Sequence, residues 1–448
     1  MTTESLESQI AVWRAYAERR YAIGTDTAEL EEHLRDRIDD LSAAGLSTDE
    51  AFLVAVKRLG SLDSLTREFA REHSDRLWKQ LVLLDDEPAG RRREVITMLA
   101  FAVAAAALVK IPIFLGVWGD SDDDVAFWGR NAALFALAPL TCYLLRVRRS
   151  DWRTGAGVAA LFAIGAVAIN AYPMKADGST VLLASLHLPI ALWLVVGIAY
   201  ADGAWRDEPQ RMDFIRFTGE WVIYMALLAL GGGVLAALIM GTFNTLGYDA
   251  GGFVLGTLLP CGAAGAVVVS AWLVEAKKSV IENMAPVLGH VFTPLFVLAL
   301  GALVAGLVIA GGIAHDRDAL ILFDLLLVVV LGLLVYCVSA RTTSDGPTWF
   351  DGLQLTLVAI TLVVDVVVLV ALVARIGDVG FSANKVAALG ENLILLANLA
   401  WSANLLRRLV CRRVGLVRLQ RWQSDYLTIY AAWAWTVVLA FPVIYGFA

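Results

Sequence analysis

The chain has 448 residues, of which 58% are hydrophobic and 18% are charged, and its formal net charge is −7. Soluble domains usually have about 25% charged residues, so this composition excludes an ordinary soluble protein of this length. The charges are uneven, because the first 94 positions hold 34 of them. The sequence therefore divides into a polar head, residues 1–90, and an apolar body, residues 91–448.

The head is predicted to be a small cytoplasmic bundle of about four helices. Ser47-Thr48-Asp49-Glu50 is a capping box in front of AFLVAVKRL, and Gly60 ends that helix. Other helices are expected over 4–20, between a cap at Thr25 or Asp26 and an end at Gly45, and after Ser61, each with one apolar face. The first ten residues are polar and lack the order of a signal peptide, so we expect the head to stay in the cytoplasm.

The head also resembles a known bacterial domain. The stretch ELEEHLRDRIDDLSAAGLSTDEAFLVAVKRLGSLDSLTREF is similar to the permease prefix domain, also called the HAAS signalling domain, over about residues 8–75. That family precedes many unrelated membrane domains. The resemblance implies a regulatory adaptor that binds a cytoplasmic protein partner, and it does not imply that the body is a permease.

The body contains eleven apolar runs, each near the roughly 20 residues that a membrane-spanning helix needs. We therefore predict an all-α, polytopic membrane bundle that contacts the lipid bilayer. The runs cover residues 95–117, 127–145, 155–172, 181–200, 217–242, 252–274, 289–312, 319–339, 352–374, 388–405 and 425–447.

The loops between these runs predict the orientation. If the head is cytoplasmic, the inside loops beyond Arg91–Arg93 hold 16 Lys and Arg residues and the outside segments hold five. Such a bias follows the positive-inside rule. It predicts a protein of the bacterial inner membrane, with the N-terminus in the cytoplasm and the C-terminus outside.

Two stretches of the body carry a second resemblance. VARIGDVGFSANKVAALGENLILLANL and SDYLTIYAAWAWTVVLAFPVIYGF resemble a broad bacterial family of uncharacterised polytopic membrane proteins, over about residues 210–448. This resemblance implies an all-helical fold and supplies no catalytic residues.

Ionisable side chains inside the apolar runs are the first candidates for a functional site, because each is costly in lipid unless it is paired or wet. Asp365 and Asp324 lie in consecutive antiparallel runs, so their carboxylates could approach each other. Lys110, in the first run, could pair with either aspartate or extend to the interface. Two readings stay open: a proton or cation pathway, and a paired polar contact that fixes helix packing. The YD and GxGD motifs of intramembrane aspartyl proteases are absent.

One apolar run also carries regularly spaced amides. Asn392, Asn398 and Asn404 follow each other at intervals of six residues, or about 240° around a helix. The three side chains therefore point in different directions, and we expect them to bond different neighbours. Elsewhere, the small residues Gly231-Gly232-Gly233 predict a tight helix–helix contact.

The loop RRLVCRRVGLVRLQRWQSD mixes arginines with apolar residues, a pattern suited to anionic lipid headgroups. The alternative is a loop that only sets topology. Nucleic acid is not an expected partner, because the head is acidic. The candidate headgroup contacts are Arg407, Arg408, Arg412, Arg413, Arg418 and Arg421.

These patterns favour two functions. The first is a sensory or signalling membrane protein whose head binds a cytoplasmic partner. The alternative is a transporter or channel for a small solute or ion, proton-coupled through Asp365, Asp324 and Lys110. We find no catalytic motif and no pattern for a metal or another cofactor, so we expect no enzyme and no cofactor. Homo-oligomerisation stays open.

Overall fold

The computed structural model describes residues 6–7, 9–11, 27–43, 46–59, 88–114, 122–175, 178–276, 285–309, 317–341 and 346–448. Every regular element in these ranges is a helix, so the predicted all-α fold is confirmed there. The chain divides into two compact units, Met1–Val95 and Ile96–Ala448.

The first unit contains α2 (Thr27–Ala43) and α3 (Thr48–Leu59), which pack through their apolar faces. Leu34 and Phe52 are buried in this contact. The predicted capping box is present, because the backbone N–H and the hydroxyl of Ser47 donate to Glu50 Oε2 at 2.9 and 2.7 Å. The helix predicted after Ser61, and most of the one predicted over 4–20, fall outside the described residues.

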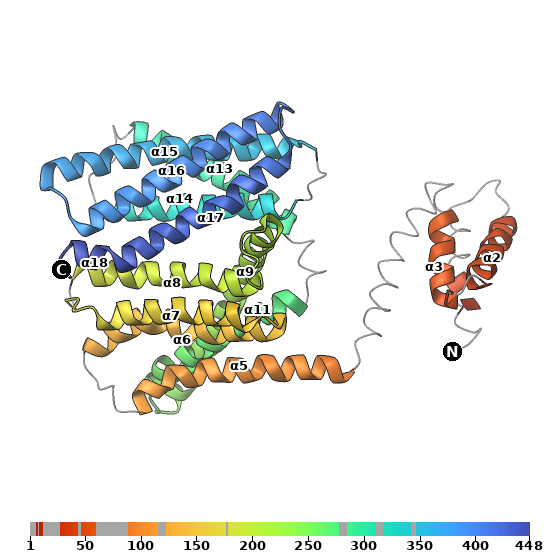
Figure 1. Ribbon diagram of the computed structural model, residues 1–448, viewed down its shortest axis with the longest axis horizontal. Helices are drawn as coiled ribbons and strands as arrows, with labels where there is room; N and C mark the ends of the chain where they lie inside the picture. Colours follow the sequence, from red (N-terminus) through yellow and green to blue (C-terminus); the bar gives the residue numbers. More distant parts are fainter. Residues whose placement is uncertain are drawn as a thin grey trace. The chain divides into compact units, whose positions relative to one another are not determined.

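Most helices of the second unit run side by side, whereas α9 and the segment that follows it cross them at an angle (Figure 1). In chain order they are α5 (Pro88–Phe114, which begins in the first unit), α6 (Asp122–Arg148), α7 (Trp152–Ala171), α8 (Ser179–Tyr200), α9 (Glu208–Thr245), α10 (Gly251–Phe253), the π-helix η1 (Val254–Leu258), α11 (Leu259–Ala276), α13 (Ala285–Ile309), α14 (Arg317–Ser339), α15 (Trp349–Val379), α16 (Ala383–Val410), α17 (Leu416–Leu439) and α18 (Phe441–Ile444).

Nine helices in the described ranges are long and apolar enough to cross a membrane. The body is therefore a helical membrane domain. The predicted runs 127–145 and 425–447 coincide with α6 and with α17 plus α18, which both contact α8 but are not among the nine. Polar residues explain the difference, since Arg130 and Asn131 lie at the start of the apolar part of α6 and Arg146 and Arg148 at its end. The first turns of α17 hold Gln420, Gln423 and Asp425. The count of eleven spans stays a prediction.

The centre of the bundle is α8, which contacts α6, α7, α16 and α17. Leu188, Leu192 and Val196 on this helix have no exposed surface. A second apolar core joins α14, α15, α16 and α17 through residues such as Leu327, Val358 and Leu399. These two cores hold α8, α14, α16 and α17 around the polar groups described below.

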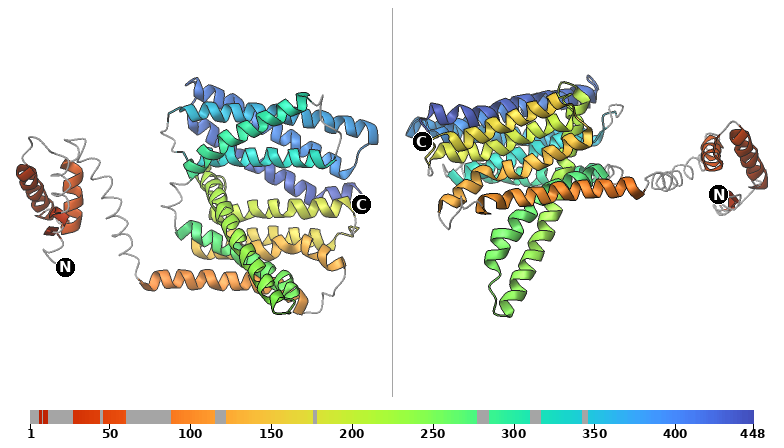
Figure 2. Two further views of the ribbon diagram at one scale, coloured as in Figure 1. Left: turned by 180° about the vertical axis from the view of Figure 1, so that it is seen from behind. Right: turned by 60° about the horizontal axis from the view of Figure 1, so that its bottom comes forward.

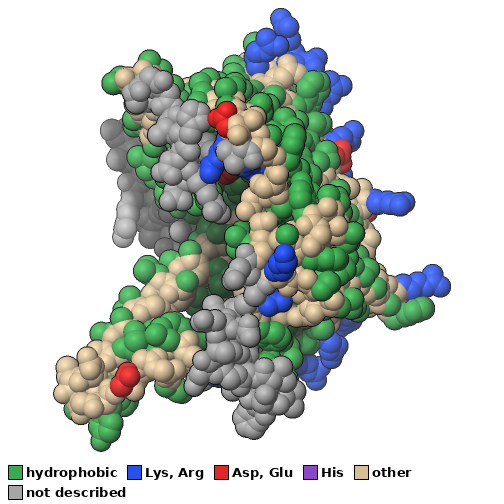
Figure 3. Space-filling model, turned by 90° about the vertical axis from the view of Figure 1, so that its left-hand side faces the viewer, with side chains coloured by type: hydrophobic (Ala, Val, Ile, Leu, Met, Phe, Trp, Pro, Cys, Tyr) green, Lys and Arg blue, Asp and Glu red, His purple; other side chains and the backbone are tan. Residues whose placement is uncertain are grey.

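One hairpin projects away from the bundle. We call residues 227–257 the arm: the outer half of α9 and the turn through α10 and η1 (Figure 2, right). Hydrophobic side chains lie on the exposed surface of the arm, among other uncharged groups and one acidic side chain in the projection at the lower left of Figure 3, and Leu230 and Leu238 are 69% and 62% exposed. A Cβ added at Gly231, Gly232 or Gly233 would meet no atom within 4 Å. The tight helix contact predicted for these glycines is therefore wrong.

The arginine-containing loops predicted to share one side of the membrane lie at one end of the bundle, the arginine end. The C-terminus lies at the other end, where the Thr180 N–H donates to the Ala448 carbonyl at 2.9 Å. Ion pairs join four helices at the arginine end. They are Arg148 of α6 with Glu275 of α11 at 3.0 Å, Arg211 of α9 with Asp425 of α17, and Arg421 of α17 with Glu208 of α9 at 2.7 Å.

Candidate functional site

Asp365 lies near the middle of α15 in the apolar stretch TLVVDVVVLVAL. Its side chain is fully buried, and neither carboxyl oxygen has a hydrogen-bond partner among the residues that the structure describes. An ionised carboxylate in such surroundings is strongly disfavoured. The group must therefore carry a proton or meet a cation that is not part of the described chain.

Asp324 of α14 interacts with it through its charge. The antiparallel helices α14 and α15 bring the two aspartates close enough for their charges to interact. Asn392 of α16 donates from Nδ2 to Asp324 Oδ1 at 3.0 Å, so Asp324 is held from a third helix. The two aspartates, predicted from sequence to approach each other, thus interact through their charges, and Asn392 is a further polar neighbour of Asp324.

A third carboxylate extends this group. Glu391, the residue before Asn392 on α16, is partly buried, and its charge interacts with that of Asp324. In the described part of the chain, Glu391 makes no ion pair with Lys or Arg. The charges of the three acids therefore interact in two pairs, Asp365 with Asp324 and Asp324 with Glu391, across α15, α14 and α16. Sequence reasoning missed Glu391, although an acid inside the predicted run 388–405 was a usable signal.

Glu391 opens onto a cavity of about 240 Å³ between α8, α14, α16 and α17. Aromatic and aliphatic side chains form nearly all of its wall. The lining residues that carry polar atoms or rings are His187, Trp193, Glu391, Tyr430 and Trp433. A carboxylate in a mostly apolar cavity with few polar groups is the usual form of a small-molecule site.

Close packing fixes two of the walls. Trp433 lies directly over Gly390, where an added Cβ would be 2.1 Å from the indole ring. Trp193 donates from Nε1 to Thr218 Oγ1 at 3.2 Å, and its ring stacks on Phe217. The absence of a side chain at Gly390 therefore brings Trp433 beside the backbone that carries Glu391.

A polar network supports the third aromatic wall. Asn398 Nδ2 donates to the Tyr430 hydroxyl at 2.6 Å and to Gln423 Oε1 at 3.2 Å. Asn398 Oδ1 accepts from Trp422 Nε1 at 2.8 Å and from the Ser402 hydroxyl at 3.0 Å. Gln423 Nε2 also donates to the Ser402 hydroxyl, at 2.6 Å. Because each polar group has partners, the network holds α16 and α17 in one register and fixes the Tyr430 ring.

His187 lies on the α8 side of the cavity and is 7% exposed. Its Nδ1 is 2.9 Å from the Leu183 carbonyl, which can only accept, so Nδ1 carries the proton in this bond. In the neutral ring, Nε2 is then an acceptor.

The amides of α16 bond different neighbours, as predicted. Asn392 contacts α14, and Asn398 contacts α17. Asn404 instead accepts from Arg407 at 3.4 Å near the end of the same helix. Only the first two therefore belong to the buried site.

Lys110 of α5 lies apart from the aspartates. Its ammonium donates to the Gly256 carbonyl at 2.8 Å and to Thr257 Oγ1 at 2.7 Å, both on η1. The π-helix widens the turn and leaves this carbonyl available to a side chain. Lys110 thus anchors the arm to α5, and the structure does not bring it to Asp365 or Asp324.

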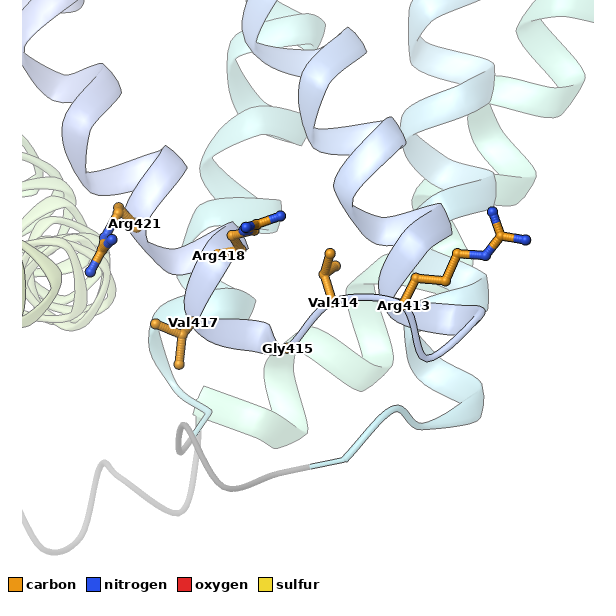
Figure 4. Close-up of a pocket in the computed structure, with 6 residues that line it drawn as sticks. All are labelled: Arg413, Val414, Gly415, Val417, Arg418 and Arg421. Carbon is orange, nitrogen blue, oxygen red and sulfur yellow. The ribbon is translucent and has the colours of Figure 1, made fainter.

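The basic loop between α16 and α17 forms a groove of about 390 Å³ at the arginine end (Figure 4). In Figure 4 the side chain of Arg421 points away from those of Arg413 and Arg418. Arg421 forms an ion pair with Glu208, whereas Arg413 and Arg418 have no acidic partner in the described ranges. The groove therefore offers a spread of positive charge, not one converging anion site. Its other lining residues are Val414, Gly415 and Val417.

No protein-family model, no curated protein and no solved structure matches this chain.

Proposed function

We propose that the body of this chain moves protons or a small cation across the membrane, as a transporter or channel. The observation that carries the proposal is the buried Asp365 carboxyl group, which has no partner among the described residues and lies beside Asp324. Intramembrane acids of this kind typically mark ion or proton pathways. Lys110, part of the site predicted from sequence, is not part of this proposal.

The three acids suggest an order of events. A cation or proton that enters the cavity meets Glu391 first, then Asp324, and then Asp365. Each step relieves the cost of an ionised carboxylate in apolar surroundings. The Asn392 amide holds Asp324 between the other two acids, so it positions the middle group.

The test is ion flux into liposomes that contain the purified chain. Under an imposed pH gradient, a pH-sensitive dye inside the liposomes reports proton movement. We expect Asp365→Asn to lower the rate at least about tenfold, since the amide keeps the shape but cannot take up a proton or neutralise a cation. The matched control is Asp378→Asn, an exposed position near the end of the same helix. Wild-type flux of protons, sodium and potassium in Asp365→Asn would refute the proposal.

We also propose a regulatory role for residues 1–90, with a cytoplasmic protein as partner. Support comes from the resemblance to the permease prefix domain and from the separate core of α2 and α3. A chain without residues 1–87 should keep its flux in liposomes and lose regulation of that flux in cells. Unchanged regulation in cells would exclude this role.

The proposed setting is the bacterial inner membrane, with the N-terminus and the arginine end in the cytoplasm and the C-terminus outside. The gathering of the arginine-rich loops at one end of the bundle supports this orientation. The exposed guanidinium groups of Arg413 and Arg418 would then face the anionic headgroups of the inner leaflet.

A further inference from the structure

The cavity beside Glu391 has an unusual combination of walls and charge. Three aromatic rings, those of Trp193, Tyr430 and Trp433, line it together with the Glu391 carboxylate. No Lys or Arg of the described chain pairs with Glu391 or lines the cavity. When Glu391 is ionised, the cavity therefore carries a negative charge without a basic partner, and this charge interacts with that of Asp324.

This combination discriminates between classes of ligand. An anion would be repelled by Glu391 and Asp324. Ca²⁺ and Mg²⁺ need about six or more oxygen ligands, and the described part of the chain has no group of three or more His, Cys or acidic side chains that could hold a metal ion. A neutral apolar molecule would leave the Glu391 charge unpaired in an apolar cavity.

An organic ammonium ion has none of these three disadvantages. The carboxylates attract it, it needs no set of oxygen ligands, and its charge pairs with that of Glu391. The faces of Trp and Tyr rings attract cations, and boxes of such rings recognise quaternary ammonium groups. The carboxylate supplies the counter-charge, while the aliphatic wall from Val328, Leu331 and Leu395 suits the methyl or methylene groups of the ligand. The volume of about 240 Å³ is below the roughly 300–1,000 Å³ of drug-sized sites, so the ligand must be small.

We propose that the cavity between α8, α14, α16 and α17 binds a small organic ammonium ion, with Glu391 as its counter-charge and Trp193, Tyr430 and Trp433 as its aromatic walls. The inference rests on the proposed function in that it names the class of cation that enters the pathway. Equilibrium binding requires no flux, so the two proposals can fail separately.

The aromatic side chains that line the cavity are held in place by other residues, so the site is preformed. Trp433 is held over Gly390, Tyr430 is held by Asn398, and Trp193 is held by Thr218. The rings therefore need little reorganisation when a ligand enters, which favours affinity. The Asn398 network, which sequence analysis placed among the polar candidates, acts here through Tyr430 as a positioning element.

The experiment compares two probes of nearly equal shape with the full-length chain in lipid nanodiscs. One is choline, a quaternary ammonium ion, and the other is 3,3-dimethylbutan-1-ol, which replaces the nitrogen by carbon and has no charge. Titration calorimetry, with tryptophan fluorescence as a second readout, measures the dissociation constants. We expect choline to bind and the neutral alcohol to bind at least about tenfold more weakly.

Variants then assign the contacts. Glu391→Gln keeps the side-chain shape and removes the charge, and we expect at least about a tenfold loss of choline affinity. Trp433→Leu should lower the affinity about tenfold as well. The matched control, Asp378→Asn, lies outside the cavity and should bind choline as the wild type does. If Glu391→Gln does not fold, Ile190→Trp is the second variant. Ile190 lines the cavity and is 48% exposed. A larger ring at this position should fill the cavity and weaken choline binding.

The outcomes separate the alternatives. Equal affinity for choline and its neutral isostere, or unchanged choline binding in both Glu391→Gln and Ile190→Trp, would overturn the proposed site. Competition by sodium at the same concentration as choline would also overturn it, because the site would then not select an organic cation. Choline binding without any flux in liposomes would leave the site in place and refute the transport proposal alone.

Discussion

Two acids at the third helical position have the same local role in different surroundings. Glu50 accepts from the Ser47 backbone N–H at 2.9 Å in an exposed capping box. Asp351 accepts from the Thr348 backbone N–H at 2.7 Å at the start of α15, but it is fully buried and also pairs with Arg341. The local motif therefore sets the start of a helix, and the surroundings decide whether the acid also joins a tertiary contact.

The capping box of α3 leads to a pH-dependent prediction. Hydrogen bonds from the Ser47 hydroxyl and backbone N–H hold the pKa of Glu50 below its ordinary value of 4.5. Since the folded pKa is lowered, the ionised group stabilises the start of α3 above the unfolded pKa, and this stabilisation is lost as the pH falls through the folded pKa.

The measurement is hydrogen–deuterium exchange of the first turn of α3 in wild type and in Glu50→Gln. Gln mimics a protonated Glu, so we expect faster exchange in the variant at about pH 7 and equal exchange at about pH 3. Asp40→Asn, at a highly exposed position of α2, serves as the control. A difference between wild type and Glu50→Gln that persists at the lower pH would contradict the explanation.

Single residues also show what could be read from sequence and what could not. The capping box at 47–50 was predictable because all of its atoms lie within four residues. Asp324 and Asp365 were found because an acid in an apolar run is costly and therefore a candidate, and Glu391 in the run 388–405 carried the same signal although it was not used. Tyr430 and Trp433 were not found, since an aromatic residue in a membrane helix becomes part of a site only when α16 and α17 bring it beside Glu391.

The helices themselves were predictable, but their packing was not. Apolar runs of about 20 residues predict helices because lipid leaves no other way to satisfy the backbone. Lipid chains are as apolar as Leu, so hydropathy is the same for a helix that faces lipid and one that faces protein. This explains why α9 was expected as an ordinary packed span, although many apolar residues of the arm, such as Leu230 and Leu238, are exposed.

Sequence alone also does not separate a glycine packed against protein from one that faces open space. A matched pair of glycine variants tests this difference. A Cβ at Gly390 would lie 2.1 Å from the Trp433 ring, whereas a Cβ at Gly231 would meet nothing within 4 Å. We expect Gly390→Ala to displace Trp433 and to cost about 1–3 kcal/mol, as overpacking of a filled interior usually does. Gly231→Ala should leave the stability nearly unchanged.

Thermal unfolding in one detergent, followed by tryptophan fluorescence, checks both variants. Gly390→Ala should unfold at a lower temperature than the wild type and should also bind choline more weakly, because Trp433 forms a wall of the cavity. Equal unfolding temperatures for the two glycine variants would show that the contact between Gly390 and Trp433 is not close in solution.

The loops that lie together at the arginine end of the bundle show how the helices of the body alternate in direction. Arg211 with Asp425 and Arg421 with Glu208 join the starts of α9 and α17, although these helices are about 200 residues apart in sequence. The positive-inside rule predicts that these loops lie on one side of the membrane from their positive charge alone. Sequence could therefore predict the alternation of the helices, because the charge bias acts on each loop separately. The pairing of individual arginines with acids depends on tertiary contacts and could not be predicted.

The proposed orientation can be tested on α16, which has accessible positions at both ends. Cys411 follows the helix at the arginine end and is exposed, and Phe381, 78% exposed, precedes it at the other end. The 28 residues of α16 span about 42 Å at 1.5 Å per residue, enough to cross a bilayer. The chain's four cysteines are free, so single-cysteine chains can be made by replacing the others with alanine.

A membrane-impermeant maleimide applied to intact cells should label a chain whose single cysteine is Phe381→Cys. A chain that keeps only Cys411 should react after the membrane is permeabilised and not before. The reverse pattern would place the arginine end outside and contradict the positive-inside bias. Labelling of both positions in intact cells would be more damaging, because α16 could not then cross the membrane, and the acids of α14, α15 and α16 could not form a path between its two sides.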